Sequence, residues 1–258
     1  MAAGLWCGAT AATDASAGAF NPPAGRGLAI VTASFAGADV FHDGAGRRIR
    51  APAYRKFELQ AHLEYGVTDW LAVIARPRLS SVTTDHARPI EANGLGASEI
   101  GVQARLWAPG DWSFAAQVLA RTPAAPTGGF EDGGGVEARL MSGRRFALFG
   151  FPAFAETHVA VRSRKGRADE ALVDTTFGVR VLPTVLVMSQ SFVTQSLESP
   201  RRAWRRGAPL GSGHMKAQLA VVVDIARDWS IGAAVYRTLT ARDASMETGA
   251  SLSAWRRF

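Results

Sequence analysis

The sequence predicts an all-β protein, a transmembrane antiparallel up-and-down β-barrel of about twelve strands with short periplasmic turns and longer extracellular loops. Two observations carry this prediction. Apolar and polar residues alternate in segments of about ten residues, the length at which a tilted strand crosses a bilayer. The connections between the segments are short and long in turn, as they must be when every second connection lies on the same side of a membrane.

Residues 57–65 show the alternation most clearly. A period of two is the repeat of a β-strand, whose successive side chains point to opposite faces. We expect the odd positions to contact lipid and the even positions to line the lumen, whereas a soluble β-sandwich or lipocalin-like barrel would turn the apolar face inward. The apolar face comprises Phe57, Leu59, Ala61, Leu63 and Tyr65, and the polar face comprises Glu58, Gln60, His62 and Glu64.

Turn signals divide the chain into twelve candidate strands. They lie at 28–38, 55–65, 70–82, 97–108, 112–122, 136–142, 153–164, 172–182, 185–194, 214–225, 229–240 and 248–258. Tight turns are expected at 66–69, 109–111, 183–184 and 226–228, with a longer member of this set at 143–152. Longer polar connections are expected at 37–54, 83–96, 123–135, 165–171, 195–213 and 241–247. An even number of strands places both ends of the barrel on the periplasmic side.

Aromatic residues gather at one end of the predicted strands. Trp70, Trp112 and Trp229 each follow a tight turn, and Tyr65 precedes one. Outer-membrane barrels carry girdles of aromatic residues at the membrane interfaces. The common position of these residues therefore predicts such a girdle at the turn side.

Composition limits the other classes of protein. No run approaches the roughly 18 apolar residues of a membrane-spanning helix. The net charge of +7 comes mainly from arginine, but the arginines are dispersed and no nucleic-acid-binding motif accompanies them, so no nucleic-acid partner is expected. Residues 1–17 resemble an export signal, with a possible cleavage site in Ala15-Ser16-Ala17, which leaves 18–258 as the barrel. The single cysteine, Cys7, lies in that signal, so neither a disulfide nor a thiolate metal site is expected.

Several segments resemble a group of small bacterial outer-membrane barrels. The segments are LEYGVTDWL at 63–71, GLGASEIGVQARLW at 94–107, NPPAGRG at 21–27 and AWRRF at 254–258. They are similar to patterns in barrels associated with the phenol-degradation meta-pathway and in the related XagA-like barrels. The resemblance implies a monomeric outer-membrane barrel of a Gram-negative bacterium. It also implies that the terminal Phe258 acts as the signal for the barrel-assembly machinery.

Charged residues on the polar faces are expected to project into the lumen. The bland interpretation is a network of ion pairs that lines or fills a polar interior, since buried charges are usually paired. The functional interpretation is a charged path whose arginines favour anions. The predicted lumen residues are Glu58, His62, Glu64, Arg76, Arg78, Glu99, Arg105, Arg121, Glu137, Arg139, Glu156, His158, Arg162, Asp174, Arg180, Lys216 and Asp224.

Basic residues also cluster in three of the long connections. Guanidinium groups pair bidentately with phosphates, so contacts with lipopolysaccharide phosphates are one hypothesis and a solvated loop surface is the other. The candidate residues are Arg47, Arg48, Arg50, Arg164, Lys165, Arg167, Arg201, Arg202, Arg205 and Arg206.

The function expected from the sequence is passive passage or export of a small hydrophilic, amphipathic or aromatic compound. A structural or accessory barrel linked to cell-surface polysaccharide or adhesion is the alternative. A membrane-embedded hydrolase is a third, in which His158 and Glu156 would meet Ser189 or Ser191, although no nucleophile motif supports it. The five histidines are too far apart in sequence to suggest a metal site, and no cofactor is expected.

Overall fold

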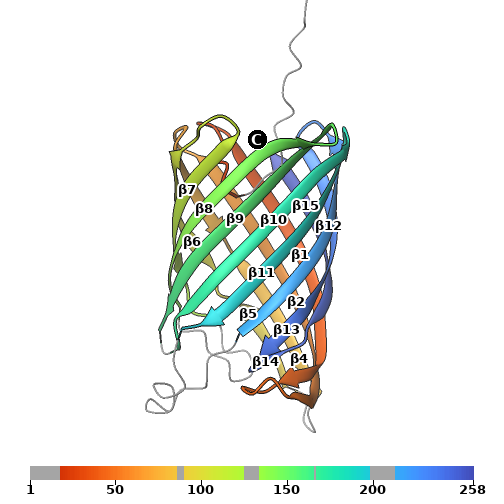
Figure 1. Ribbon diagram of the computed structural model, residues 1–258. Helices are drawn as coiled ribbons and strands as arrows, with labels where there is room; N and C mark the ends of the chain where they lie inside the picture. Colours follow the sequence, from red (N-terminus) through yellow and green to blue (C-terminus); the bar gives the residue numbers. More distant parts are fainter. Residues whose placement is uncertain (1–17, 86–89, 125–133, 166, 198–212) are drawn as a thin grey trace, which may run out of the picture.

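The chain forms a closed antiparallel β-barrel with strongly tilted strands (Figure 1). The computed structural model describes residues 18–85, 90–124, 134–165, 167–197 and 213–258. The strands are β1 (Gly27–His42), β2 (Arg48–Gly66), β3 (Leu71–Arg76), β4 (Arg78–Thr84), β5 (Ile90–Leu95), β6 (Glu99–Trp107), β7 (Trp112–Arg121), β8 (Gly135–Leu148), β9 (Phe151–Arg164), β10 (Glu170–Leu182), β11 (Val185–Ser196), β12 (Gly213–Ala226), β13 (Trp229–Arg242), β14 (Ala244–Ser245) and β15 (Thr248–Arg257).

These strands make a twelve-stranded barrel, as the sequence predicted. β3 and β4 occupy one position around the wall and β5 and β6 the next, because β3 pairs with β6 while β4 pairs with β5. β14 adds only a two-residue pairing to β1. Strand β1 closes the wall by pairing with β15 on one side and with β2 on the other. Neighbouring strands are otherwise consecutive in sequence, the topology of an up-and-down barrel.

The two ends of the barrel differ in their connections. At the end called here the turn end, which is at the top of Figure 1, short turns occupy residues 67–70, 108–111, 149–150, 183–184 and 227–228. The start of β1 and the end of the chain also lie there, where Gly27 and Phe258, the residue after β15, exchange two backbone hydrogen bonds of 2.7 and 3.0 Å. The opposite end, called the loop end, carries the longer connections.

One predicted connection is wrong. The sequence suggested a longer loop over 143–152, but β8 continues to Leu148 and a two-residue turn leads directly into β9. Both turn residues have positive φ, 50° for Phe149 and 85° for Gly150, as in the turns that match the twist of a two-residue hairpin. Gly143, Arg144 and Arg145 interrupt the apolar alternation of the sequence, although in the structure they continue the strand.

At the loop end the strands are longer than predicted. β1 and β2 continue as a hairpin to residues 42 and 48, β5 forms inside the expected connection 83–96, and β14 forms inside 241–247. In the extension of β2, Arg48 and Arg50 lie on one face and Ile49, Ala51 and Ala53 on the other, so both the alternation and the backbone ladder continue beyond the predicted start of the strand.

The outer wall of the barrel is an apolar belt. Nearly every wall strand places large apolar side chains outward, and among them Leu140 on β8 and Leu252 on β15 are 63% and 65% exposed. The expected lipid-facing residues Phe57 and Leu63 are also exposed. An exposed apolar surface that continues around a closed barrel is stable only in a bilayer. Within the described ranges no helix is long and apolar enough to cross a membrane.

Aromatic side chains follow the turn end of this belt. Trp112 and Trp229 are the first residues of β7 and β13, Trp70 precedes β3 by one residue, and all three are exposed. The guanidinium of Arg144 lies 5.2 Å from the Trp112 ring, and that of Arg256 lies 5.3 Å from the Trp229 ring. Rings with an adjacent cation match the boundary between hydrocarbon and headgroups.

Candidate functional site in the barrel lumen

One wall of the lumen is apolar near the turn end. The strands that form it carry apolar residues on both faces, so that Leu186 and Met188 point inward while Val187 between them is exposed on the outside. Trp255 lies in the same cluster and donates its indole N–H to Ser253 Oγ at 2.8 Å. The cluster, called here the apolar wall, comprises Leu28, Ile30, Phe154, Leu186, Met188, Ala220, Val222 and Trp255.

A cavity of about 220 Å³ lies beside the apolar wall. Its other lining groups are hydroxyls and amides together with His62 and Glu156. Gln218 Nε2 donates to Gln190 Oε1 at 2.8 Å, and Gln190 Nε2 donates to Thr176 Oγ1 at 3.2 Å, so that a row of amides on β12 and β11 ends at a hydroxyl on β10. The cavity therefore offers an apolar face and neutral hydrogen-bonding groups together.

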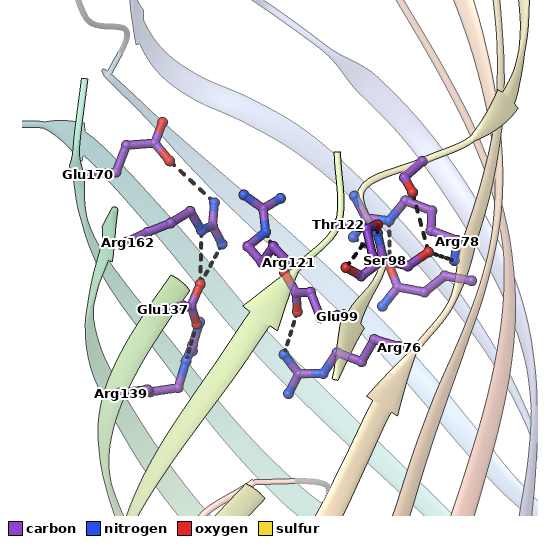
Figure 2. Close-up of polar contacts among 12 residues, drawn as sticks. Arg76, Arg78, Ser98, Glu99, Arg121, Thr122, Glu137, Arg139, Arg162 and Glu170 are labelled. Atoms are coloured by element: carbon purple, nitrogen blue, oxygen red, sulfur yellow. Dashed lines mark hydrogen bonds and ion pairs between the residues drawn. The ribbon is translucent and has the colours of Figure 1, made fainter. Parts of the chain in front are cut away.

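A network of ion pairs continues from β8 to β10 toward the loop end. Figure 2 shows the carboxylate of Glu137 between the guanidinium groups of Arg139 and Arg162, which lie 2.8 and 2.7 Å away. Arg162 also reaches Glu170 at 3.3 Å, and Arg139 reaches Asp174. Because Glu137 lies opposite Arg162 in the β8–β9 ladder, the register itself places the charges together.

A second group of the network lies on β3, β6 and β7. Glu99 accepts hydrogen bonds from Arg121 Nε at 2.9 Å and from Arg76 Nη1 at 3.2 Å (Figure 2). Arg76 Nε donates to His62 Nδ1 at 3.0 Å, so the imidazole accepts at Nδ1 and in its neutral form carries its proton on Nε2. Each arginine of the network thus contacts a carboxylate and is not free in the lumen.

Two more charged clusters lie at the ends of the lumen. Near the loop end, Glu247 contacts Lys216 and Tyr54, and Lys56 Nζ lies 3.2 Å from both Glu247 and Glu58. Arg78 Nη1 lies 3.7 Å from Glu58, and the Arg78 guanidinium also donates to Gln60.

Near the turn end the central carboxylate is Asp224. It accepts from Arg180 at 2.7 Å, from Arg257 at 3.3 Å and from Ser230 Oγ at 2.6 Å. The charges at both ends of the lumen are therefore compensated as well.

Two buried histidine–glutamate pairs lie on opposite walls. His62 Nε2 lies 3.6 Å from Glu64 Oε2 on β2, and His158 Nε2 lies 3.6 Å from Glu156 Oε2 on β9. Both carboxylates are almost completely buried. Neither of these imidazole Nε2 atoms has a hydrogen-bond partner within the described part of the chain.

Residues 18–21 enter the lumen from the turn end. Gln103 Nε2 donates to the Gly18 carbonyl at 2.7 Å and to Asn21 Oδ1 at 2.8 Å, and Ser113 Oγ donates to the Ala19 carbonyl at 2.7 Å. The Phe20 ring lies 3.9 Å below the guanidinium of Arg145. This segment, called here the lumen strap, covers part of the inner wall formed by β6, β7 and β8.

The catalytic arrangement considered from the sequence is not assembled. Gln190 and Met188 on β11 line the cavity, so Ser189 and Ser191 point to the outside of the wall. His158 and Glu156 point inward. A hydrolase that needs a serine beside this histidine cannot form from these residues. The described ranges also contain no group of three or more His, Cys, Asp or Glu residues placed to hold a metal ion.

The other predicted sites are placed as follows. Arg105 lies on the inward-facing positions of β6 and is half-buried. Arg164 bonds Glu170 at 3.1 Å, and Arg47 pairs with Asp43 in the exposed β1–β2 hairpin, where the Arg47 backbone N–H lowers the pKa of the Asp43 carboxyl. Lipopolysaccharide binding stays a prediction. Its candidates Arg201, Arg202, Arg205 and Arg206, like the export signal 1–17, lie outside the described residues.

Sequence reasoning missed the neutral half of the lumen. Gln103, Gln117, Gln190 and Gln218 are inward-facing amides, and they could have been found by following the same alternation that located the charged residues. The apolar wall had no comparable signal, because strands with apolar residues on both faces do not reveal which one points inward.

No family model and no curated protein matches the chain. Among solved structures, an outer membrane channel from Pseudomonas putida F1 has a TM-score of 0.71 at 12% identity, and the match covers 95% of this chain and all of that one. The β domain of the Bordetella autotransporter BrkA follows with 0.56 at 14% identity, covering 91% and 100%. The toluene transporter TodX of P. putida has 0.51 at 10% identity, covering 93% and 91%. These likenesses, together with the apolar belt, identify the fold as that of an outer-membrane β-barrel.

Proposed function

We propose that the protein is an outer-membrane channel for small amphipathic molecules that combine an apolar ring or chain with one polar group. The observation that carries the proposal is the cavity of about 220 Å³ between the apolar wall and the row of amides. Apolar protein cavities of about 150 Å³ hold a benzene molecule, so this one has room for a single ring and a substituent.

The chemistry of the lining supports this class of permeant. A ring that passes the apolar wall removes apolar surface from water at roughly 25 cal/mol per Å², while the amides of Gln190 and Gln218 offer donors and acceptors to its polar group. A fully hydrated sugar or ion gains nothing from Met188 or Trp255. Channels and a toluene transporter occur among the structures with this fold, which agrees with the proposal.

The charge pattern argues for weak ion selectivity. The sequence alone suggested that arginines would favour anions, but Arg76, Arg121, Arg139 and Arg162 each contact a carboxylate. A paired guanidinium attracts a passing anion less than a free one. We therefore expect the apolar wall to discriminate between permeants more strongly than the net charge does.

Ion current through single barrels in a planar bilayer tests the proposal. Benzoate should produce transient blocks of the current, whereas acetate, which has the same charge but no ring, should not. Met188→Gln should shorten or weaken the benzoate blocks by about tenfold, equivalent to about 1.4 kcal/mol. Phe192→Gln is the matched control, because Phe192 is an inward residue of the same strand outside the cavity lining. Absence of current steps would instead support a structural barrel, and equal blocks by acetate would refute the role of the apolar wall.

A further inference from the structure

Glu156 differs from most other carboxylates of the lumen in having no permanent cation beside it. It is only 4% exposed, and its described contacts are the Ala19 backbone N–H at 3.2 Å and His158 Nε2 at 3.6 Å. Of the described lumen carboxylates, only Glu64 shares this lack of an arginine or lysine. Those that have one within 4 Å are Glu58, Glu99, Glu137, Glu170, Asp174, Asp224 and Glu247.

A buried carboxylate without a cation is strongly destabilised. Removal of a charge from water is compensated only when an opposite charge and hydrogen bonds replace the water. One backbone N–H and a distant imidazole provide less than the two guanidinium groups around Glu137 provide. The surroundings of Glu156 therefore point to a missing cation on the side of the lumen strap.

Gly18 occupies the place where that cation would be. A Cβ atom on Gly18 would overlap the Glu156 carboxylate, so the Gly18 Cα lies beside the carboxylate, and its nitrogen is one bond away from that Cα. The rest of the strap is fixed, since Gln103 holds the Gly18 carbonyl and Ser113 holds the Ala19 carbonyl. Only a residue without a side chain fits this position.

The sequence before Gly18 supplies the means to create a cation there. Ala15-Ser16-Ala17 has the small residues that signal peptidases recognise at −3 and −1. Hydrolysis of the peptide bond between Ala17 and Gly18 consumes one water molecule, leaves a carboxylate on Ala17 and releases an ammonium on Gly18. We propose that the mature chain begins at Gly18 and that its α-ammonium forms an ion pair with Glu156, which locks the lumen strap inside the barrel.

The lock has a consequence for passage, which rests on the proposed channel function. The strap holds Phe20 under Arg145. Gly143 leaves room for the Phe20 ring, since a Cβ atom on residue 143 would lie 2.8 Å from that ring. With the ammonium in place, Phe20 and its neighbours remain against β8 inside the turn end. Without it, the strap keeps its hydrogen bonds but loses the charge that fixes its first residue.

Two measurements that do not depend on channel activity test the ion pair. Intact mass of the protein purified from outer membranes should correspond to residues 18–258. The α-amine should react with an amine-reactive ester slowly in the native barrel and about tenfold faster in Glu156→Gln, a ratio equivalent to about one pKa unit. Glu64→Gln is the matched control, because Glu64 also lies 3.6 Å from a histidine, His62, and has no described contact with the strap. It should leave the reaction slow.

A second variant tests the ion pair in a chain that keeps Glu156. Two extra alanines before Gly18 move the ammonium away from Glu156. They should lower the temperature at which the barrel unfolds in heat-modifiable gel migration, and should have little effect when Glu156 is already glutamine. A mature chain that starts elsewhere, equal labelling of native and Glu156→Gln protein, or an equal effect of the alanines in both backgrounds would each overturn the proposal. Absence of conductance would refute only the proposed channel.

Discussion

Arg162 on β9 places its Nη2 atom 2.7 Å from Oε2 of Glu137, the residue directly opposite it on β8. The other oxygen of Glu137 accepts from Arg139, and the Glu137 side chain is only 1% exposed. One carboxylate therefore separates two guanidinium groups within the wall of the lumen. Replacement of Glu137 would therefore remove an ion pair from both Arg139 and Arg162.

Glu137→Gln should destabilise the barrel and make its lumen more attractive to anions. The amide keeps the shape of the side chain but leaves Arg139 and Arg162 facing each other across a neutral group. Breaking a buried pair costs about 3–5 kcal/mol, and the partly solvated lumen reduces this toward the lower end. Chemical unfolding and the reversal potential in a salt gradient measure the two effects. Glu91→Gln, on the exposed side of β5, should change neither, and equal effects of both substitutions would contradict the assigned role.

Leu140 follows Arg139 on β8 but faces lipid, so its side chain must be apolar where that of Arg139 is charged. Leu140→Arg should destabilise the barrel by about 2–4 kcal/mol, because an arginine near the bilayer midplane leaves water without a partner. Leu148→Arg on the same outward face of the strand lies closer to the turn end, beyond the level of Arg144 and Trp112, and should cost only about 0–1 kcal/mol. Urea unfolding in lipid vesicles compares the two. Equal losses would mean that the membrane does not surround Leu140.

Much of the fold could be predicted because a barrel strand with a lipid face and a polar lumen face has a periodic sequence. Residues 57–65 alternate without interruption, and their orientation follows from that pattern. The break between β3 and β4 at Pro77 was not expected, although proline cannot donate to a ladder. The predicted strand 70–82 continues across it, since the alternation resumes at Arg78.

Of the functional site, only the charged lumen residues could be predicted from the sequence. Glu137, Arg139 and Arg162 stand out among apolar neighbours, so their inward direction is apparent. Leu186, Met188 and Val222 belong to strands with apolar residues on both faces, and only the closed barrel decides which of them meet in the cavity. The lumen strap could not be predicted either. Its contacts join Gly18 with Gln103 and Ala19 with Glu156 across 85 and 137 residues of sequence.

The hairpin turn at 149–150, which the sequence suggested as a loop, leads to a local prediction. Gly150→Ala should destabilise the barrel by about 1 kcal/mol, because φ of 85° is unfavourable for a residue with a Cβ atom. Phe149→Gly should have the opposite sign or no effect, since Phe149 has φ of 50° and its ring is 92% exposed. Unfolding midpoints of the two variants give the comparison. Stabilisation by Gly150→Ala would show that the turn has a different backbone.

Gln103 is the residue through which the lumen strap is held by hydrogen bonds. Its side chain is 1% exposed, donates to Gly18 and Asn21, and accepts from Gln117 at 2.9 Å. Gln103→Leu leaves the partners buried without a hydrogen bond, at a cost of about 1–3 kcal/mol.

That loss should release the strap rather than unfold the barrel, because the strap is attached to the wall by a few polar contacts and by the packing of Ala19 against Ala115 and Met141, none of which belongs to the ladder of the barrel. Elastase, which cuts after small residues, should therefore cleave after Ala19 in Gln103→Leu and spare the native protein, in which Ala19 is fully buried. Gln60→Leu is the matched control, since Gln60 is also an inward-facing amide but accepts hydrogen bonds from Arg78 and has no described contact with the strap. If both variants are cleaved at the same rate, Gln103 does not hold the strap, and the hydrogen bonds to Gly18 and Asn21 contribute nothing to its position.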